Sequence, residues 1–424
     1  MSESPGQQQE KPKENKGLFT WLRTVWDKMM HDGRGDSIKV RVKRIKKSLS
    51  RKAFREDGTM SAEHPVEGAP KQARKRYRSN RHPMRNMVAA GREMGERKRE
   101  VDQLRRKQVR KRTEEVEELE RKPQDFPFSR YFLGGEEPEA PKQMINWREW
   151  KNDAITAGWI GHSTVLINFF GKWIMTDPVF SKKTGYDIEI MVVGPTRIVS
   201  AAADPADLPR IDLLLLSHAH MDHTDKPSLR KLLNARHLSC AVNTADIYQK
   251  LGFQDVQEIE WGNRLLYDAI DLTVEAIEVK HFGWRYPWEP CRGRNEEGGR
   301  SFNAFMVEGL DPSGRLRTIV FAGDTAYTPT FKKLGDRLRS EGRTVDLAIM
   351  PIGAYEPWIG AHCNPEQAWQ MTREMNAECI LPVHWNTFIQ SAEPRFEPIE
   401  WLVSEVEDDD RIVIKEIGET WSTK

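Results

Sequence analysis

The sequence predicts an α/β protein, built from layers of strands and helices around one large core and preceded by a separate basic region. Two observations lead to this prediction. From about Ile145 onward, short apolar runs alternate with amphipathic segments over some 280 residues, the pattern of strands interleaved with helices. The charge is also divided: residues 1–125 hold 34 Lys+Arg against 20 Asp+Glu, a net of +14, whereas residues 126–424 have a net of −12.

Several classes of protein are excluded by composition. No run approaches the roughly 18 to 20 apolar residues that a membrane span needs, and the first 16 residues are too polar for a secretory signal. The cysteines are scattered without a CxxC pair, which indicates neither a disulfide framework nor a thiolate zinc knuckle: Cys240, Cys291, Cys363 and Cys379. We therefore expect a cytoplasmic protein, with peripheral attachment to a membrane as a further option.

The basic N-terminal region, residues 1–125, contains two candidate helices. Residues 17–30 form an amphipathic pattern with two tryptophans, and the cluster RVKRIKK follows, a combination that suits an anionic membrane surface. Docking of this helix on the protein's own globular part remains the alternative. Residues 88–122 are dense in charge and favour a partly helical, solvated segment; phospholipid or nucleic-acid binding is the functional alternative. The composition of residues 126–144 predicts a linker. The sequence leaves open whether the protein forms an oligomer.

The domain expected over residues 145–424 is read in order along the chain. Residues 155–169 and 171–180 predict a hairpin or meander with its turn at 170–172. The nearly all-apolar run 211–217 predicts a strand buried on both faces, and a helix signal follows at 225–234. Further strands are predicted at 272–279, 317–323, 346–353 and 379–384, with a helix at 365–376.

Four residues with metal-binding side chains stand directly after the strand 211–217. The segment reads Ser217-His218-Ala219-His220-Met221-Asp222-His223. His218 and His220 can direct their imidazoles to one point, while Asp222 and His223 face a second point about 3.5 Å away, as two-metal sites require. Imidazole and carboxylate without thiolate suit zinc, and also manganese or iron as the carboxylate content rises.

With this HxHxDH segment, the chain resembles the metallo-β-lactamase fold hydrolases. Candidates for that family's later ligands follow in order, each at the end of a predicted strand: His281 in EVKHFGW, Asp324 in FAGDTAY and His384 in LPVHWNTF. The resemblance covers about residues 150–400 and implies a four-layer αββα sandwich with the metals at one edge of two sheets. It also implies a division of seven metal ligands: His218, His220 and His281 on one zinc, Asp222, His223 and His384 on a second, and Asp324 bridging both.

The likeness narrows around the ligands to one branch, that of N-acyl-phosphatidylethanolamine-hydrolysing phospholipase D and its bacterial relatives. The similar blocks are WIGHSTVLINF, TDPVFS, GDTAY, PIGAYEP and HWNTF. Two features depart from the branch: Thr224 stands where leucine is common, and the basic N-terminus lies outside the resemblance. Both leave the phospholipid assignment open.

The resemblance implies a phosphodiesterase of phospholipase D type that acts on N-acyl-phosphatidylethanolamine-like lipids by attack of a metal-bridging hydroxide. Asp222, Asp324 and His362 are then the catalytic residues, His362 because its position lies near the substrate in that branch. Two divalent ions, two aspartates and one hydroxide sum to about +1, which favours an anionic substrate. In the second interpretation the protein has the same metals, but its substrate is a soluble lactone, ester or cyclic phosphate.

Two further function classes are weaker. A nuclease is disfavoured because the basic region mixes in acids and lacks interleaved aromatics beyond Tyr77. A non-catalytic binding protein is disfavoured because all seven ligand positions are filled.

Other residues near the motifs have competing interpretations. His162 and Asp177 end the first strands and are candidates to support the ligand imidazoles or to act structurally. Asn364 to Gln367 read as the capped start of a helix, which leaves His362 outside it. Four tryptophans near the ligands are expected either to line a groove for acyl chains or to belong to the core: Trp284, Trp288, Trp358 and Trp385. Cys291 and Cys363 are expected to be inert.

Overall fold

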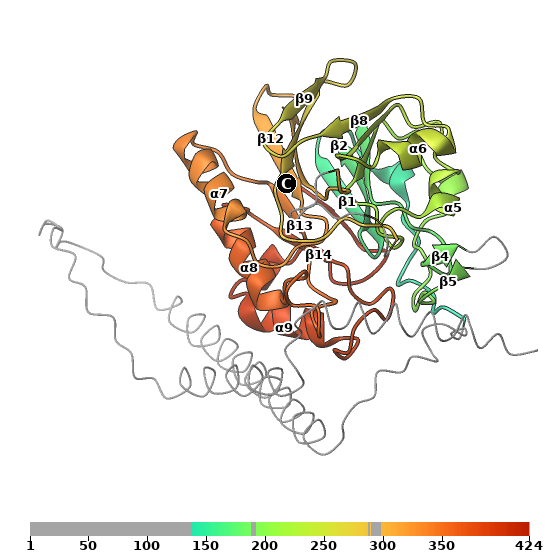
Figure 1. Ribbon diagram of the computed structural model, residues 1–424. Coiled ribbons are helices and arrows are strands. Elements are labelled where there is room, and N and C mark those ends of the chain that lie inside the picture. Colours follow the sequence, from blue (N-terminus) through green and yellow to red (C-terminus); the bar gives the residue numbers. More distant parts are fainter. Residues whose placement is uncertain (1–136, 188–191, 287–288, 290–297, 424) are drawn as a thin grey trace, which may run out of the picture. The chain divides into compact units, whose positions relative to one another are not determined.

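The fold is a four-layer αββα sandwich, as predicted. The computed structural model describes residues 137–187, 192–286, 289 and 298–423 (Figure 1). Within these ranges two sheets share one hydrophobic core, to which both contribute, for example Leu166 from the first sheet and Ile319 from the second. Helices α7, α8 and α9 lie on one side of the sheets and α5 and α6 on the other (Figure 1).

The first sheet has seven strands in the order β15-β1-β2-β3-β6-β7-β8. Its strands are β1 (Ile155–Gly161), β2 (Thr164–Phe169), β3 (Lys172–Thr176), β6 (Leu213–Leu216), β7 (His237–Ala241), β8 (Val256–Ile259) and β15 (Thr420–Ser422). β1, β2 and β3 form the predicted meander, with Phe170 and Gly171 at its second turn. From β3 to β8 the pairing is parallel, and β6 is buried at every position, as its apolar run predicts.

The second sheet has six strands in the order β14-β13-β12-β11-β10-β9. Its strands are β9 (Arg264–Tyr267), β10 (Leu272–Ile277), β11 (Ala304–Leu310), β12 (Leu316–Phe321), β13 (Leu347–Pro351) and β14 (Ile380–Val383). β12, β13 and β14 pair in parallel, while the other pairs are antiparallel. A small separate sheet joins β4 (Tyr186–Asp187) to β5 (Val192–Val193).

The helices cover the outer faces. They are α5 (Lys226–Leu229), α6 (Ala245–Leu251), α7 (Thr330–Ser340), α8 (Pro365–Glu374) and α9 (Glu397–Glu405), with short 3₁₀ helices at Trp147–Glu149, Pro205–Asp207 and Asp409–Arg411. α8 starts with the predicted capping box, in which Asn364 accepts from the amide of Gln367 and the Gln367 side chain accepts from the amide of Asn364. α5 is one turn long, shorter than the helix predicted over residues 225–234.

The chain before β1 is already part of the folded unit. Glu139 donates its amide to the carbonyl of Ile198 over 2.7 Å, and its side chain forms an ion pair with Arg395. Residues 137–144 of the expected linker thus pair with the domain. The helices predicted at 17–30 and 88–122 lie outside the described residues. No helix in the described part of the chain is long and apolar enough to cross a membrane.

The topology brings the chemistry-bearing residues to one edge of both sheets. Asp177 follows β3, the HxHxDH segment follows β6, Asp324 follows β12 and His384 follows β14. Because these strands run parallel within their sheets, their carboxyl ends meet at the same edge, where α/β proteins place their sites.

Candidate metal centre

Several loop residues at this edge have a left-handed backbone conformation that residues other than glycine seldom adopt. His162, Asp177 and His384 have positive φ angles of 53°, 28° and 63°. Such angles in residues other than glycine cost free energy and cluster at functional sites. The loops of the two sheets are also tied together, since the amide of His384 donates to the carbonyl of His162 over 3.1 Å.

Three histidines form the first group of metal-binding atoms. His218 Nε2 lies 2.8 Å from His220 Nδ1, which lies 3.3 Å from His281 Nε2. A zinc ion with tetrahedral bonds of 2.0–2.1 Å would separate its ligand nitrogens by about 3.3 Å, so this spacing is close to what one ion needs. The same three residues form one of the clusters able to hold a metal.

Asp222, His223 and His384 form the second group. Asp222 Oδ2 lies 3.5 Å from His223 Nε2 and 3.6 Å from His384 Nε2. His162 joins this group through a 3.0 Å contact from its Nε2 to the same oxygen. The structure therefore brings together the residues of both ligand sets that the resemblance implies, with His162 beside the second.

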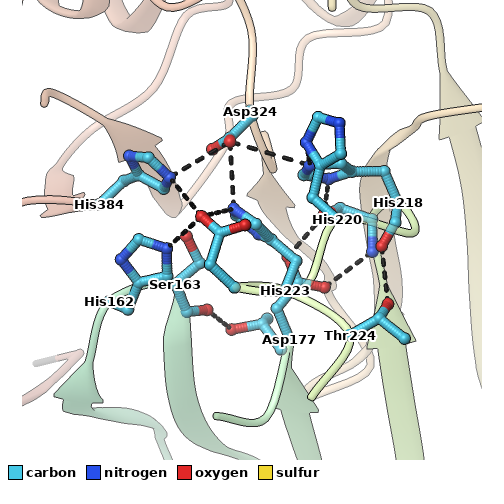
Figure 2. Close-up of polar contacts among 12 residues, drawn as sticks. His162, Ser163, Asp177, His218, His220, His223, Thr224, Asp324 and His384 are labelled. Carbon is cyan, nitrogen blue, oxygen red and sulfur yellow. Dashed lines mark hydrogen bonds and ion pairs between the residues drawn. The ribbon is translucent and has the colours of Figure 1, made fainter. Parts of the chain in front are cut away.

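Asp324 lies between the two groups. Its Oδ2 is 3.0 Å from His223 Nε2, 3.2 Å from His384 Nε2 and 3.9 Å from both His218 Nε2 and His281 Nε2 (Figure 2). Gly323 makes this approach possible, because a Cβ there would stand 2.6 Å from the Cβ of Ser217. Asp324 therefore lies within 4 Å of ring nitrogens from both groups.

Buried polar atoms without partners show that this donor set fits metal ions. Among the described residues, His223 Nε2, His384 Nε2 and Asp324 Oδ1 are buried and make no hydrogen bond. Such atoms are costly unless a ligand binds them. All three belong to the predicted metal ligands.

The charges of the two groups differ. Burial and the neighbouring His223 hold the pKa of His218 well below its usual range, and burial with His281 lowers that of His220 to about 3. Both rings are therefore neutral donors, the form that binds metal. Burial opposes ionisation of Asp222 in the second group and of Asp324 between the groups, but His223 keeps the pKa of both carboxyls well below their usual range. Two anionic carboxylates in a buried site call for cationic partners.

Comparison with known proteins agrees with this geometry. Residues 172–385, about half of the chain, match the family model described as the beta-lactamase superfamily domain. The chain belongs to the metallo-β-lactamase superfamily. Within the superfamily, the chain belongs to the branch that resembles N-acyl-phosphatidylethanolamine-hydrolysing phospholipase D. The protein is a metal-dependent hydrolase.

Three relatives illustrate the superfamily assignment. An uncharacterized protein of Mycobacterium tuberculosis is 30% identical over 280 residues, which cover 64% of this chain and 69% of that protein. N-acyl-phosphatidylethanolamine-hydrolyzing phospholipase D 1 of Caenorhabditis elegans is 28% identical over 286 residues, 62% of this chain and 75% of that enzyme. A metal-dependent hydrolase of Shouchella clausii is 26% identical over 264 residues, 61% of this chain and 96% of that protein.

Asp177 supports the ligand His223 from behind. Its Oδ2 accepts from His223 Nδ1 over 2.7 Å and from the hydroxyl of Ser217 over 2.5 Å, and its Oδ1 accepts from the amide of Ser217 over 2.7 Å. A proton held at Nδ1 leaves Nε2 of His223 as the metal-binding atom. His162 plays a matching part for Asp222.

Replacing Asp177 by asparagine is expected to weaken binding of the second metal by about 10- to 100-fold. The amide has one acceptor oxygen, so either the His223 ring or the Ser217 amide would face an NH₂ group. Metal titration of the apoprotein measures the change. Asp311→Asn is the matched control, since Asp311 is also a buried carboxylate that accepts from backbone amides, here those of Ser313 and Arg315. Unchanged affinity in Asp177→Asn would contradict this role.

The loop that carries the first ligands is held by residues the sequence analysis did not select. Thr224, which departs from the branch's usual leucine, donates its hydroxyl to the carbonyl of His218 over 2.7 Å and contacts the hydroxyl of Tyr248 at 3.0 Å. Arg285, which is buried, donates through Nη1 to the carbonyls of Ala219 and Thr224 over 2.9 and 3.0 Å. No spacing in the sequence signals the Arg285 contacts, because they join distant segments.

His362 and Gln390 border the centre. His362 Nδ1 lies 3.8 Å from Asp324 Oδ2, is buried and has no hydrogen-bond partner among the described residues. The side-chain amide of Gln390 donates to Asp222 over 2.5 Å and was not among the predicted site residues. A role of His362 in substrate contact stays a prediction.

The predicted tryptophan groove is divided between site and core. Trp284 is half-buried, with its ring 5.4 Å from that of His220, and Trp358 is half-buried and donates to the carbonyl of Gln390. Trp385 is 5% exposed and packs on Trp159 in the core. Trp288 and Cys291 lie outside the described residues. Burial raises the pKa of the Cys363 thiol, in agreement with an inert cysteine.

Proposed function

We propose that this metal-dependent hydrolase is a di-zinc phosphodiesterase of phospholipase D type, which acts on N-acyl-phosphatidylethanolamine-like lipids. The similarity to the Caenorhabditis elegans phospholipase over 75% of that enzyme carries the proposal. The cluster of all seven predicted ligands supports it, since the whole donor set that the resemblance implies is gathered at one edge of the sheets.

Each residue of the centre would have its own role in such a reaction. Bound zinc ions would lower the pKa of a water molecule and neutralise the negative charge that develops on the phosphate oxygens. His218, His220 and His281 would hold one ion, Asp222, His223 and His384 the other, and Asp324 would contact both. His162 and Gln390 fix the carboxylate of Asp222, and Asp177 fixes the ring of His223. His362 Nδ1, which has no hydrogen-bond partner among the described residues, would contact a substrate oxygen.

Apolar surface beside the centre supports a lipid substrate. Phe282 and Trp284 are half-buried and stack with ring centroids 5.6 Å apart, next to His220. Ile389 is 41% exposed and precedes Gln390, whose side chain contacts Asp222. These side chains are suited to an acyl chain that approaches the metals. Attachment of residues 1–125 to an anionic membrane stays a prediction of the sequence.

The test compares lipid and soluble substrates on the zinc-loaded, full-length protein. Vesicles that contain N-acyl-phosphatidylethanolamine are assayed beside bis-p-nitrophenyl phosphate and a panel of lactones. We expect release of phosphatidic acid and N-acylethanolamine, with the bond from phosphorus to the ethanolamine oxygen broken and water supplying the new oxygen. Hydrolysis of lactones alone would contradict the proposal and favour the alternative in which the same metals serve a soluble ester.

A further inference from the structure

A cavity of about 400 Å³ lies apart from the metal cluster, beside the loop that carries the first ligands. None of the predicted metal ligands is among its lining residues, which come from α5, α6 and the segments on either side of residue 290. Five of the lining side chains are cationic and two are anionic, so the cavity has an excess of three positive charges. The remaining question is which of these charges are already paired.

Four of the seven charges neutralise one another. Arg300 donates to Asp246 over 2.6 Å and to Glu289 over 3.0 and 3.1 Å, and Lys250 donates to Asp246 over 3.1 Å. Glu289 also accepts from the amides of Arg285 and Tyr286. This network is balanced and forms a fixed wall of the cavity.

The excess belongs to Lys226, Arg230 and Arg285. None of these three side chains has a carboxylate partner among the described residues. Arg285 is 4% exposed, and its Nε is buried without a hydrogen-bond partner within the described ranges. A buried guanidinium without a counter-charge is costly unless an anion binds near it.

We propose that this cavity binds a phosphate monoester, with Lys226, Arg230 and Arg285 as its cationic ligands. Guanidinium and ammonium groups together favour phosphate oxygens, because each contact is charge-assisted and arginine can bind two oxygens at once. The site is separate from the proposed substrate site, and the inference does not depend on the proposed activity. Since Arg285 also donates to the carbonyls of Ala219 and Thr224, an occupant would sit behind the metal-binding loop.

Calorimetric titration of the zinc-loaded, full-length protein with inorganic phosphate tests the proposal. The variant Lys226→Gln/Arg230→Gln removes two of the three cations and leaves Arg285, which supports the metal loop, in place. We expect a phosphate site in the unaltered protein that weakens by at least about tenfold in the variant, because the variant loses two charge-assisted contacts to the phosphate oxygens. Phosphate that binds at the metals is common to both proteins and cancels in the comparison.

Two controls separate the cavity from general charge effects. Lys151→Gln/Lys231→Gln removes two exposed lysines that do not line the cavity, and its phosphate affinity is expected to be unchanged. Turnover of bis-p-nitrophenyl phosphate by the cavity variant reports that the metal centre is intact. Equal phosphate binding in the unaltered protein and the cavity variant, or equal losses in the two double variants, would overturn the proposal.

The source of the phosphate is distinguished by two further probes. Glycerol phosphate represents a soluble ligand, and phosphatidic acid in phosphatidylcholine vesicles represents a lipid headgroup. The basic N-terminal region is present in every protein compared, so its attraction to vesicles is constant. If the cavity variant binds glycerol phosphate more weakly but binds the vesicles as the unaltered protein does, the site takes a soluble phosphate ligand. If the cavity variant also binds the vesicles more weakly, the site takes a lipid headgroup.

Discussion

Replacement of Asp324 by asparagine is expected to lower turnover of bis-p-nitrophenyl phosphate by about 10²- to 10³-fold. Asp324 Oδ2 is within 4 Å of ring nitrogens from both ligand groups, so its charge serves both metal positions. Asparagine keeps the shape but removes the negative charge, which leaves one carboxylate, Asp222, to balance two divalent ions. Metal analysis of the purified variant should show a deficit relative to the unaltered protein.

The control for this variant is another buried aspartate. Asp346 lies at the start of β13, forms an ion pair with Arg317 over 2.6 Å and accepts from the amide of Thr318. Asp346→Asn is expected to lower the melting temperature without changing the metal content or the turnover per folded molecule. Full metal content and normal turnover in Asp324→Asn would exclude a bridging role for Asp324.

The HxHxDH segment illustrates what the sequence could predict. Its four predicted ligands lie within six consecutive residues, directly after a strand with a continuous apolar run. Because they are close in sequence, their pattern could be recognised without the structure. The three later ligands required the family resemblance, because nothing in composition or spacing connects His281, Asp324 and His384 to that strand. The structure connects them by placing the carboxyl ends of the strands at one edge.

The surroundings of the ligands were less predictable. Arg285, Tyr248 and Gln390 contact the HxHxDH segment or Thr224, which follows it, from positions 24 to 168 residues away in the chain. Each contact depends on side-chain packing between elements, and a single arginine or glutamine in a sequence has many other possible partners. The division of the tryptophans has the same origin, since Trp385 follows the ligand His384 directly but its ring turns into the core against Trp159.

Among the elements, those with an apolar run were predicted from the sequence, and some with mixed patterns were missed. The strands β6, β13 and β14 are apolar and buried throughout, β12 ends in the apolar run of residues 319–321, and all four lie where predicted. β11 and α7 were not located: β11 includes Glu308, which is buried in an ion pair with Arg343, and α7 has a glycine at position 335 that lowers helix propensity. Gly335 is needed because a Cβ there would stand 2.0 Å from the carbonyl oxygen of Glu374 in α8.

Removal of the metals is expected to abolish activity and to lower the melting temperature by about 10 °C. Most of the predicted ligands are buried, and atoms of His223, His384 and Asp324 have no hydrogen-bond partner among the described residues, so the apoprotein holds uncompensated polar groups in its interior. An ion that binds only the folded state at about 1,000 times its dissociation constant contributes about 4 kcal/mol. For a domain of this size each kcal/mol changes the melting temperature by about 2 to 4 °C. Thermal unfolding and turnover with and without EDTA measure both effects.

A variant without the first ligand group separates metal loss from other effects of the chelator. His218→Ala/His220→Ala removes two imidazoles from one metal position, so EDTA should shift its melting temperature by less than it shifts that of the unaltered protein. EDTA that is already saturated with zinc should have no effect on either protein, because it has no capacity left to take zinc from the imidazole ligands. Readdition of zinc should restore turnover to the unaltered protein alone. If EDTA changed neither turnover nor melting temperature of the unaltered protein, the buried cluster would not be a metal centre.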